Sequence, residues 1–219
     1  MDPPRVLPSP VRFWDGMVHE SRFSHPLHLD WLTRHNVDTH ARILDFGCGY
    51  GRTLAELARA GYDNIVGIDF SFHMLARCRS LLPDVSLAQN CEQTLPVRSH
   101  SVDIVLLLAV LTCMPRDDDQ RALLREITRA LRPGGLLYIS DLLLNSDSRN
   151  LERYACYASE YGTYGIFELP EGVVLRHHRK EWIEELTTSF THLEFHPFEA
   201  ATMNGHTSAA FQYLGRAPV

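Results

Sequence analysis

The sequence predicts an α/β fold in which helices pack on both faces of a mostly parallel β-sheet. Strand-like and helix-like segments alternate along residues 41–144, an order typical of parallel sheets joined by helical crossovers. The strand candidate at residues 102–109 is almost entirely apolar and therefore belongs at the centre of the sheet. Near the C-terminus, Asn204-Gly205 separates two strand-like runs, which predicts an antiparallel hairpin.

The elements of the first part follow from apolar periodicity and from the residues that end them. The expected strands are, in order, residues 41–47, 65–70, 85–90, 102–109 and 136–144. Helical spacing lies between them at residues 53–60, 74–82 and 117–131. These three helices end at Gly61, Pro83 and Pro133, residues that commonly stop a helix.

The remainder of the chain departs from this rhythm. The next segment carries Tyr154, Tyr157, Tyr161 and Tyr164, and a hairpin candidate turns at residues 170–172. A short helix follows at residues 180–188, and the last two strand candidates are residues 193–202 and 209–214. We expect one domain over residues 1–219. Its expected parts are an N-terminal arm or lid (1–40), a ligand-binding core (41–144), a substrate-side insertion and helix (145–190) and a C-terminal hairpin (191–219).

Charge and composition limit the class of partner. The formal net charge is −6 and the sequence pI is about 6.0, so the chain lacks the basic field that concentrates proteins on nucleic acid or anionic lipid. We expect a small-molecule substrate, no nucleic-acid or membrane partner, and a monomer or homodimer.

The cysteines indicate the compartment. All five (Cys48, Cys78, Cys91, Cys113 and Cys156) are scattered and form no C-x-x-C pair, which predicts free thiols in a reducing environment. The first ten residues lack the apolar core of a signal peptide. The longest apolar run, residues 104–110, falls far short of the roughly 20 residues of a membrane helix. The expected location is cytoplasmic.

Residues 43–52, ILDFGCGYGR, place three glycines at alternate positions after a strand. The dinucleotide fingerprint is G-x-G-x-x-G, but here Arg52 follows Gly51 and the third glycine of that fingerprint is missing. Asp45 would oppose a bound pyrophosphate, so a cationic ligand suits the loop better. Asp69, at the end of the second strand, is placed to accept hydrogen bonds from a ribose.

Five stretches in this order resemble the class I S-adenosylmethionine-dependent methyltransferases. They are ILDFGCGYGR (43–52), IVGIDF (65–70), NCEQTLP (90–96), VDIV (102–105) and LRPGG (131–135). They correspond to the family's acid-plus-glycines motif, its second-strand acid, its D-A-x-x-L-P stretch, its F-D-x-V strand and its L-x-P-G-G turn. Asn90 stands where the family usually has an acid.

The resemblance implies a Rossmann-like, doubly wound, seven-stranded and mostly parallel sheet with an antiparallel C-terminal strand, in three α/β/α layers. It also implies S-adenosylmethionine as cofactor. In this family the glycine loop lines the methionine and ribose end, the second-strand acid holds the ribose hydroxyls, and the third-strand stretch lies near the adenine. The implied cofactor-binding residues are Asp45, Gly47, Cys48, Gly49, Gly51, Asp69, Phe70, Asn90, Cys91, Glu92, Leu108 and Trp14.

Segments outside the shared core are expected to contact the substrate. The N-terminal segment with Trp14 is either a lid over the cofactor or an aromatic anchor on the sheet. The tyrosine-rich residues 154–164 form either a second wall of the site or an interface. The candidate catalytic residues are Thr112 after the fourth strand, Tyr161 in the tyrosine-rich segment, and His206 in the last turn, which lies at the carboxyl edge if the sixth strand is parallel.

Two other groups of side chains are ambiguous. Residues 176–179 (RHHR) form a basic patch that either receives a carboxylate or is a solvated helix entry. The histidines show no accompanying cluster of acids or cysteines, so no metal site is expected.

The sequence therefore predicts an enzyme that transfers a methyl group from S-adenosylmethionine to an oxygen, nitrogen or sulfur atom of a small molecule. In-line displacement requires mainly alignment, and a general base only for an acceptor that arrives protonated. The alternatives are a cofactor-binding regulatory or scaffold module without turnover and an NAD-linked oxidoreductase. The oxidoreductase reading leaves Asp45 and Arg52 unexplained.

Overall fold

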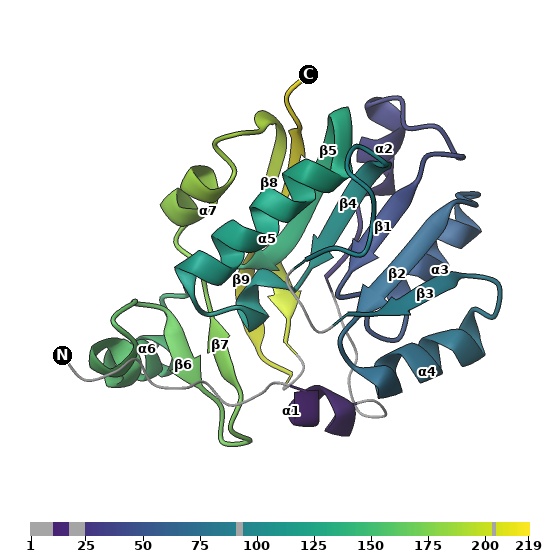
Figure 1. Ribbon diagram of the computed structural model, residues 1–219. Coiled ribbons are helices and arrows are strands. Elements are labelled where there is room, and N and C mark those ends of the chain that lie inside the picture. The colour runs from purple at the N-terminus through teal and green to yellow at the C-terminus, as the bar shows by residue number, and fades with distance from the viewer. Residues whose placement is uncertain (1–10, 18–24, 91–93, 203–204) are drawn as a thin grey trace.

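A computed structural model of the chain describes residues 11–17, 25–90, 94–202 and 205–219. Its main sheet has seven strands in the order β3-β2-β1-β4-β5-β9-β8 (Figure 1). Their bounds are Ile43–Phe46 (β1), Ile65–Asp69 (β2), Ser86–Gln89 (β3), Val102–Leu108 (β4), Leu131–Leu142 (β5), Thr191–Ala201 (β8) and Thr207–Arg216 (β9). Strand β9 pairs antiparallel with both neighbours, and the other pairs are parallel. The predicted seven-stranded sheet is confirmed.

Helices cover both faces of this sheet and give three layers (Figure 1). Helices α2, α3 and α4 lie on one face, and α5 and α7 lie on the other. Their bounds are Leu29–Arg34, Arg52–Arg59, Phe72–Leu81, Asp117–Ala130 and Lys180–Leu186, respectively.

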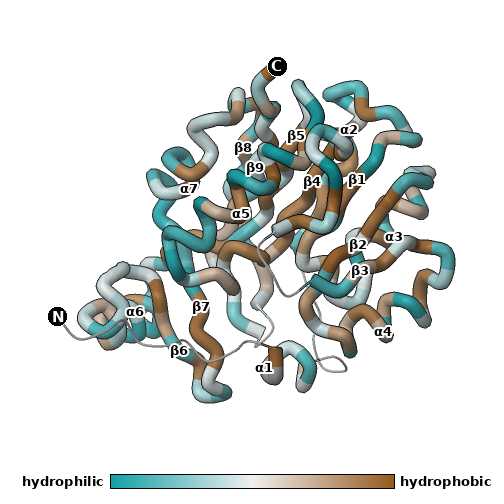
Figure 2. Tube along the Cα trace, in the orientation of Figure 1, coloured by the Kyte–Doolittle hydropathy of each residue, from teal (hydrophilic) through white to brown (hydrophobic). Residues whose placement is uncertain are grey.

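Alternate residues of the central strands enter two separate cores. Leu44 and Val105 pack with the helices on the α5 face, whereas Ile43 and Ile104 pack with those on the α3 face. Successive side chains of a strand point to opposite faces, so strands that are apolar throughout occupy the middle of the sheet. Figure 2 shows hydrophobic residues concentrated along the strands and hydrophilic residues on the outer sides of the helices.

The tyrosine-rich segment is a helix, α6 (Ser148–Tyr161), which the sequence pattern did not reveal. Asp147 caps its start by accepting a hydrogen bond from the Asn150 amide at 3.1 Å, and Gly162 ends it with a φ of +65°. Only Asn150 and Tyr154 of this helix are buried. Two buried residues four apart make too narrow an apolar stripe to signal a helix in the sequence.

A separate two-stranded hairpin follows α6. Strands β6 (Ile166–Glu168) and β7 (Val174–Arg176) pair antiparallel, as the turn at residues 170–172 predicted. The hairpin joins the main sheet through a bridge between Leu143 and His178. Together α6, β6 and β7 extend the carboxyl edge of the sheet beyond β5 (Figure 1).

The C-terminal hairpin is confirmed and is longer than predicted. Strand β8 runs parallel to β5, so the turn between β8 and β9 lies at the carboxyl edge of the sheet. Asn204 lies outside the described residues, and Gly205 has a φ of +74°. Across the part of the chain that the structure describes, every helix is too short or too polar to cross a bilayer.

Candidate functional site

The glycine loop between β1 and α3 has a backbone that only glycine adopts easily. Gly47, Gly49 and Gly51 have φ angles of +75°, +53° and +87°, values that cost an ordinary residue about 1–2 kcal/mol. A Cβ atom at Gly47 would lie 2.7 Å from Cγ2 of Val110, and one at Gly51 would collide with Sγ of Cys78. Cys48 is itself buried against Gly67. One side of the loop is therefore closely packed against neighbouring side chains of the protein.

Asp69 fastens this loop to the end of β2. Its Oδ2 atom accepts the Gly49 amide at 2.8 Å, and its Oδ1 atom accepts the Ser71 amide at 2.8 Å. Burial raises the pKa of the Asp69 carboxyl, and the backbone hydrogen bonds oppose this rise. Each carboxylate oxygen can accept a further hydrogen bond, so Asp69 can hold the loop and still receive ligand hydroxyls.

Asp45 is a buried carboxyl with an unsatisfied oxygen. It is 2% exposed, and its Oδ2 atom has no hydrogen-bond partner among the described residues. Burial raises its pKa to about 7, although the nearby Arg52 guanidinium lowers it. An unsatisfied buried carboxyl is costly, so this atom fits a ligand that brings a donor or positive charge into the glycine loop.

The N-terminal helix α1 (Val11–Gly16) lies against the start of α4. Asp15 accepts a hydrogen bond from the Ser71 hydroxyl at 2.6 Å, and Ser71 is also the N-cap of α4. Trp14 is half-buried and packs edge-to-face with Phe13. The segment predicted as a lid or anchor thus lies near α4 (Figure 1), and its Asp15 contacts Ser71, two residues after Asp69. Asp15 was not among the predicted site residues, because its contact with Ser71 spans 56 residues.

The predicted adenine side is described only in part. Asn90 follows β3, its amide donates to the Asp69 carbonyl at 3.0 Å, and its Nδ2 atom donates to the Thr94 carbonyl at 2.9 Å. Phe70 is half-buried beside Asp69. Cys91 and Glu92 lie outside the described residues, so those two assignments stay predictions.

Strand β4 ends at the same edge of the sheet. Leu108 is partly exposed there, and Ala109 follows with a φ of +56°. A positive φ is uncommon for alanine and often marks a functional or strained site. The Ala109 amide donates to the Ser140 carbonyl of β5 at 2.8 Å, so β4 and β5 are joined where the loop of β1 also ends.

Residues 44–139, which contain this site, match a family model described as a methyltransferase domain. This part of the chain is similar to the methyltransferase domains of the class I S-adenosylmethionine-dependent methyltransferases. The cofactor of the family is S-adenosylmethionine. The methyltransferase fold is shared by a solved S-adenosylmethionine-dependent methyltransferase from Methanosarcina mazei, with a TM-score of 0.80 and 22% identity, covering 86% of this chain and 97% of that one.

Two curated relatives are similar over the same region. A trans-aconitate 2-methyltransferase of Azoarcus sp. (strain BH72) is 37% identical over 111 residues, which are 50% of this chain and 42% of the relative. A ubiquinone biosynthesis O-methyltransferase of Erwinia tasmaniensis is 30% identical over 145 residues, 63% of this chain and 58% of the relative. The chain thus spans about half the length of the curated relatives it matches.

The donor set of this methyltransferase domain fits S-adenosylmethionine. The sulfonium and the amino group of the cofactor are positively charged, and Asp45 offers an unsatisfied oxygen beside the loop. Ribose hydroxyls are donors that Asp69 can receive. The glycine loop leaves room for a ligand where side chains would otherwise stand.

The three predicted catalytic residues lie in different surroundings. Thr112 is buried in the short 3₁₀ helix η1 (Leu111–Cys113), and its hydroxyl donates to the Arg176 carbonyl at 2.8 Å. Tyr161 is on α6, and its hydroxyl donates to Glu168 at 3.3 Å. His206 is exposed in the turn between β8 and β9. The structure thus gives Thr112 and Tyr161 contacts within the protein, and His206 is the most exposed of the three.

The predicted basic patch at residues 176–179 is wrong. Arg176, His177 and His178 are buried, at 3%, 2% and 0% exposure. The Arg176 guanidinium pairs with Asp117 at 2.5 Å and donates to the Pro115 carbonyl at 3.0 Å. Burial lowers the pKa of both histidines, so they carry no charge at neutral pH. Strand β7 ends at Arg176, and the two histidines that follow it are buried as well, which the polarity of this run in the sequence did not reveal.

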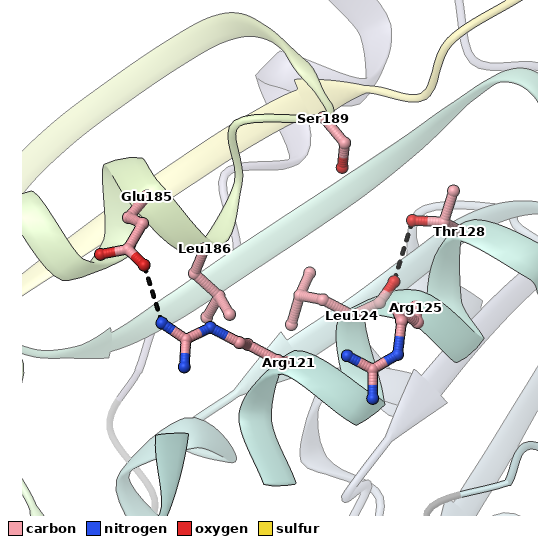
Figure 3. Close-up of a pocket in the computed structure, with 7 residues that line it drawn as sticks. All are labelled: Arg121, Leu124, Arg125, Thr128, Glu185, Leu186 and Ser189. Carbon is pink, nitrogen blue, oxygen red and sulfur yellow. Dashed lines mark hydrogen bonds and ion pairs between the residues drawn. The ribbon is translucent and has the colours of Figure 1, made fainter. Parts of the chain in front are cut away.

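A shallow groove lies where α5 and α7 meet (Figure 3). An ion pair between Arg121 and Glu185 at 2.7 Å spans it, and Thr128 donates to the Leu124 carbonyl at 2.9 Å. The groove is on the outer surface of the α5 face, away from the glycine loop (Figure 1). Among the described residues, no three histidine, cysteine or acidic side chains gather as metal ligands would.

Proposed function

We propose that the chain transfers a methyl group from S-adenosylmethionine to a small molecule. The observation that carries this proposal is the buried, unsatisfied Oδ2 atom of Asp45 beside three left-handed glycines. A fold alone does not determine function, but this combination suits a cationic ligand. The names of the curated relatives, which are methyltransferases of small molecules, support the same substrate class.

Bound S-adenosylmethionine would supply an activated methyl group that an acceptor lone pair can displace. The residues of the chain contribute binding and alignment, which provide much of the acceleration in such a displacement. Gly47 and Gly49 hold the loop open, Asp69 receives the ribose hydroxyls, and the Asp45 carboxyl receives a donor or positive charge. Helix α1 lies beside Asp69, where it helps to exclude water.

Calorimetric titration with S-adenosylhomocysteine, and separately with NADH, tests the cofactor. We expect S-adenosylhomocysteine alone to bind. The variant Asp45→Leu sharpens the test, because it replaces an unsatisfied buried carboxyl by an apolar side chain of similar size. It should lose affinity for S-adenosylhomocysteine while its stability in urea stays equal to wild type or rises. Binding of NADH alone would overturn the proposal.

Transfer of a radiolabelled methyl group tests the activity. Phenol, benzoate, thiophenol and aniline present a hydroxyl, carboxylate, thiol and amine on one ring, so they compare the acceptor atoms directly. Turnover of any of these is the expected result. Tight binding of S-adenosylhomocysteine, with labelling of added protein or RNA and of none of the four compounds, would replace a small-molecule acceptor by a macromolecular one.

A further inference from the structure

His25 stands at the carboxyl edge of the sheet although it precedes β1 in the chain. Its Nδ1 atom lies 3.0 Å from Oγ of Ser140, and its ring packs edge-to-face with Phe198 of β8 at 6.0 Å. Ser140 pairs with Leu108, the last residue of β4. His25 is therefore placed over the ends of β4 and β5, beside the glycine loop.

The distance to the cofactor loop follows from the sheet. Gly47 follows Phe46, whose neighbour on β4 is Leu107, and Ser140 lies on the next strand. Two strand spacings of about 4.8 Å separate Ser140 from the loop by roughly 10 Å. On that scale, the reacting end of a cofactor held by the loop, together with a small acceptor, would reach from the loop to His25.

Three contacts fix the backbone around His25. The Arg52 guanidinium donates to the His25 carbonyl, and Nε2 of Gln212 donates to the Pro26 carbonyl at 2.6 Å. The His28 amide donates to the Tyr138 hydroxyl at 3.1 Å. A side chain held by surrounding contacts in this way is pre-organised, as a reacting group must be.

The outer ring nitrogen of His25 is available. His25 is 7% exposed, and among the described residues its Nε2 atom has no hydrogen-bond partner. If Nδ1–H donates to Ser140, Nε2 carries the lone pair. Burial and the Arg52 guanidinium lower the pKa of His25 to about 4, so the ring is neutral at physiological pH.

We propose that His25 is a catalytic residue whose Nε2 atom accepts the proton of a hydroxyl-bearing acceptor, of which phenol is the simplest form. As the oxygen bonds to the methyl carbon, the sulfur–methyl bond breaks with its electrons left on sulfur, and the O–H proton passes to Nε2. The hydroxyl becomes strongly acidic as its oxygen shares a lone pair, so a weak base suffices. The imidazolium then releases the proton to water.

The neighbouring cations do not favour a carboxylate acceptor. The terminal nitrogens of Arg52 already contact Glu56 at 2.7 Å and the His25 carbonyl. Arg176 is paired with Asp117. A neutral imidazole beside the Phe198 ring suits a neutral aromatic hydroxyl better than an anion. The assignment rests on the proposed function, because it needs the cofactor in the glycine loop.

The first experiment compares acceptors in the variant His25→Ala, with His40→Gln as a control. His40 is exposed and pairs with Asp63 at the far edge of the sheet. With phenol, His25→Ala should lose about 10²–10⁴-fold in rate at neutral pH and recover as rising pH ionises the phenol. With 4-nitrophenol, which ionises near neutral pH, the loss should be small. A purely structural defect would lower both rates equally at every pH.

The second experiment does not depend on turnover. Long-range ¹H–¹⁵N NMR spectra of the S-adenosylhomocysteine complex should show His25 with its proton on Nδ1, and added phenol should shift the Nε2 resonance. An Nε2–H tautomer, or no shift with phenol, would overturn the proposal. Turnover of benzoate, thiophenol or aniline but not of phenol would also overturn it. If S-adenosylhomocysteine fails to bind wild type, the proposed function itself has failed.

Discussion

The Oδ2 atom of Asp69 accepts the amide hydrogen of Gly49 across a distance of 2.8 Å. The contact spans 20 residues and joins the end of β2 to the middle of the glycine loop. The same carboxylate accepts the Ser71 amide at the start of α4. One side chain therefore holds both the glycine loop and the start of α4, and we propose that it also accepts hydrogen bonds from the cofactor ribose.

The variant Asp69→Ala should therefore lose affinity for S-adenosylhomocysteine. Hydrogen bonds to a charged group contribute about 1.5–3 kcal/mol each, so we expect a loss of roughly 100-fold in the dissociation constant measured by calorimetry. Asp63→Ala is the control and should bind normally, since Asp63 lies at the opposite edge of the sheet and pairs with the exposed His40. Wild-type affinity in Asp69→Ala would remove Asp69 from the cofactor site.

Gly51→Ala and Gly61→Ala separate backbone strain from crowding. Both glycines have positive φ, +87° and +91°, but a Cβ at Gly61 meets nothing within 4 Å, whereas one at Gly51 collides with Cys78. Gly61→Ala should cost about 1–2 kcal/mol of unfolding free energy, and Gly51→Ala a further 1–3 kcal/mol or so from overpacking. Urea unfolding measures both, and equal losses would contradict the crowding at the loop.

Asp117→Ala should destabilise the fold because it leaves the buried Arg176 charge without its partner. Arg176 has a side-chain exposure of 4%, and unpairing a buried charge costs about 3 kcal/mol or more. Asp118→Ala is the matched control, since Asp118 is also in the first turn of α5 but has a side-chain exposure of 99%. If the two variants unfold at the same urea concentration, Arg176 is not held as the structure shows.

Asp141→Asn should change how stability depends on pH. Burial raises the pKa of Asp141 to about 7, above its value in the unfolded chain. Between about pH 4 and 7 the folded state keeps a proton that the unfolded state has lost, so this group makes wild type less stable as pH rises. An asparagine side chain at this position cannot titrate, and the variant should gain up to about 4 kcal/mol relative to wild type across that window.

Urea unfolding at several pH values between 4 and 8 checks this expectation. Asp45 shifts in the same direction, but it is present in both proteins and cancels in the comparison. Asp84→Asn, an exposed substitution, should show the wild-type pH dependence. A stability difference between Asp141→Asn and wild type that does not change with pH would show that Asp141 ionises normally in the folded protein.

The sheet and the acid-and-glycine loop could be predicted because their signals are local. Residues 43–52 carry the strand, the glycines and Asp45 in one continuous stretch, and the alternation of strands and helices leaves few possible topologies. The strand bounds differ from the predicted ones by a few residues at most, apart from those of β5. This strand begins at Leu131, before the predicted start at residue 136, and its first residues include Pro133 and Gly134, which we expected to end a helix. Side-chain periodicity alone does not show where pairing begins.

The errors came from residues whose surroundings are set by distant parts of the chain. The polar run at residues 176–179 looked solvated, but Arg176 at the end of β7 and the two histidines after it are buried. Helix α6 shows only Asn150 and Tyr154 to the interior, so its pattern resembled a loop. His25 has no motif around it, and its partner Ser140 is 115 residues away.

By itself, the sequence determined the fold class, the antiparallel C-terminal hairpin and the acid-and-glycine loop, because these depend on spacing within short segments. Only the tertiary structure decided which polar groups are buried, paired or left with a free acceptor atom. Nothing in the sequence around Asp45, Arg176 or His25 shows whether the side chain is buried, paired or left without a partner. Their burial and pairing depend on chain segments that meet only when the sheet, its helices and the N-terminal segment pack together.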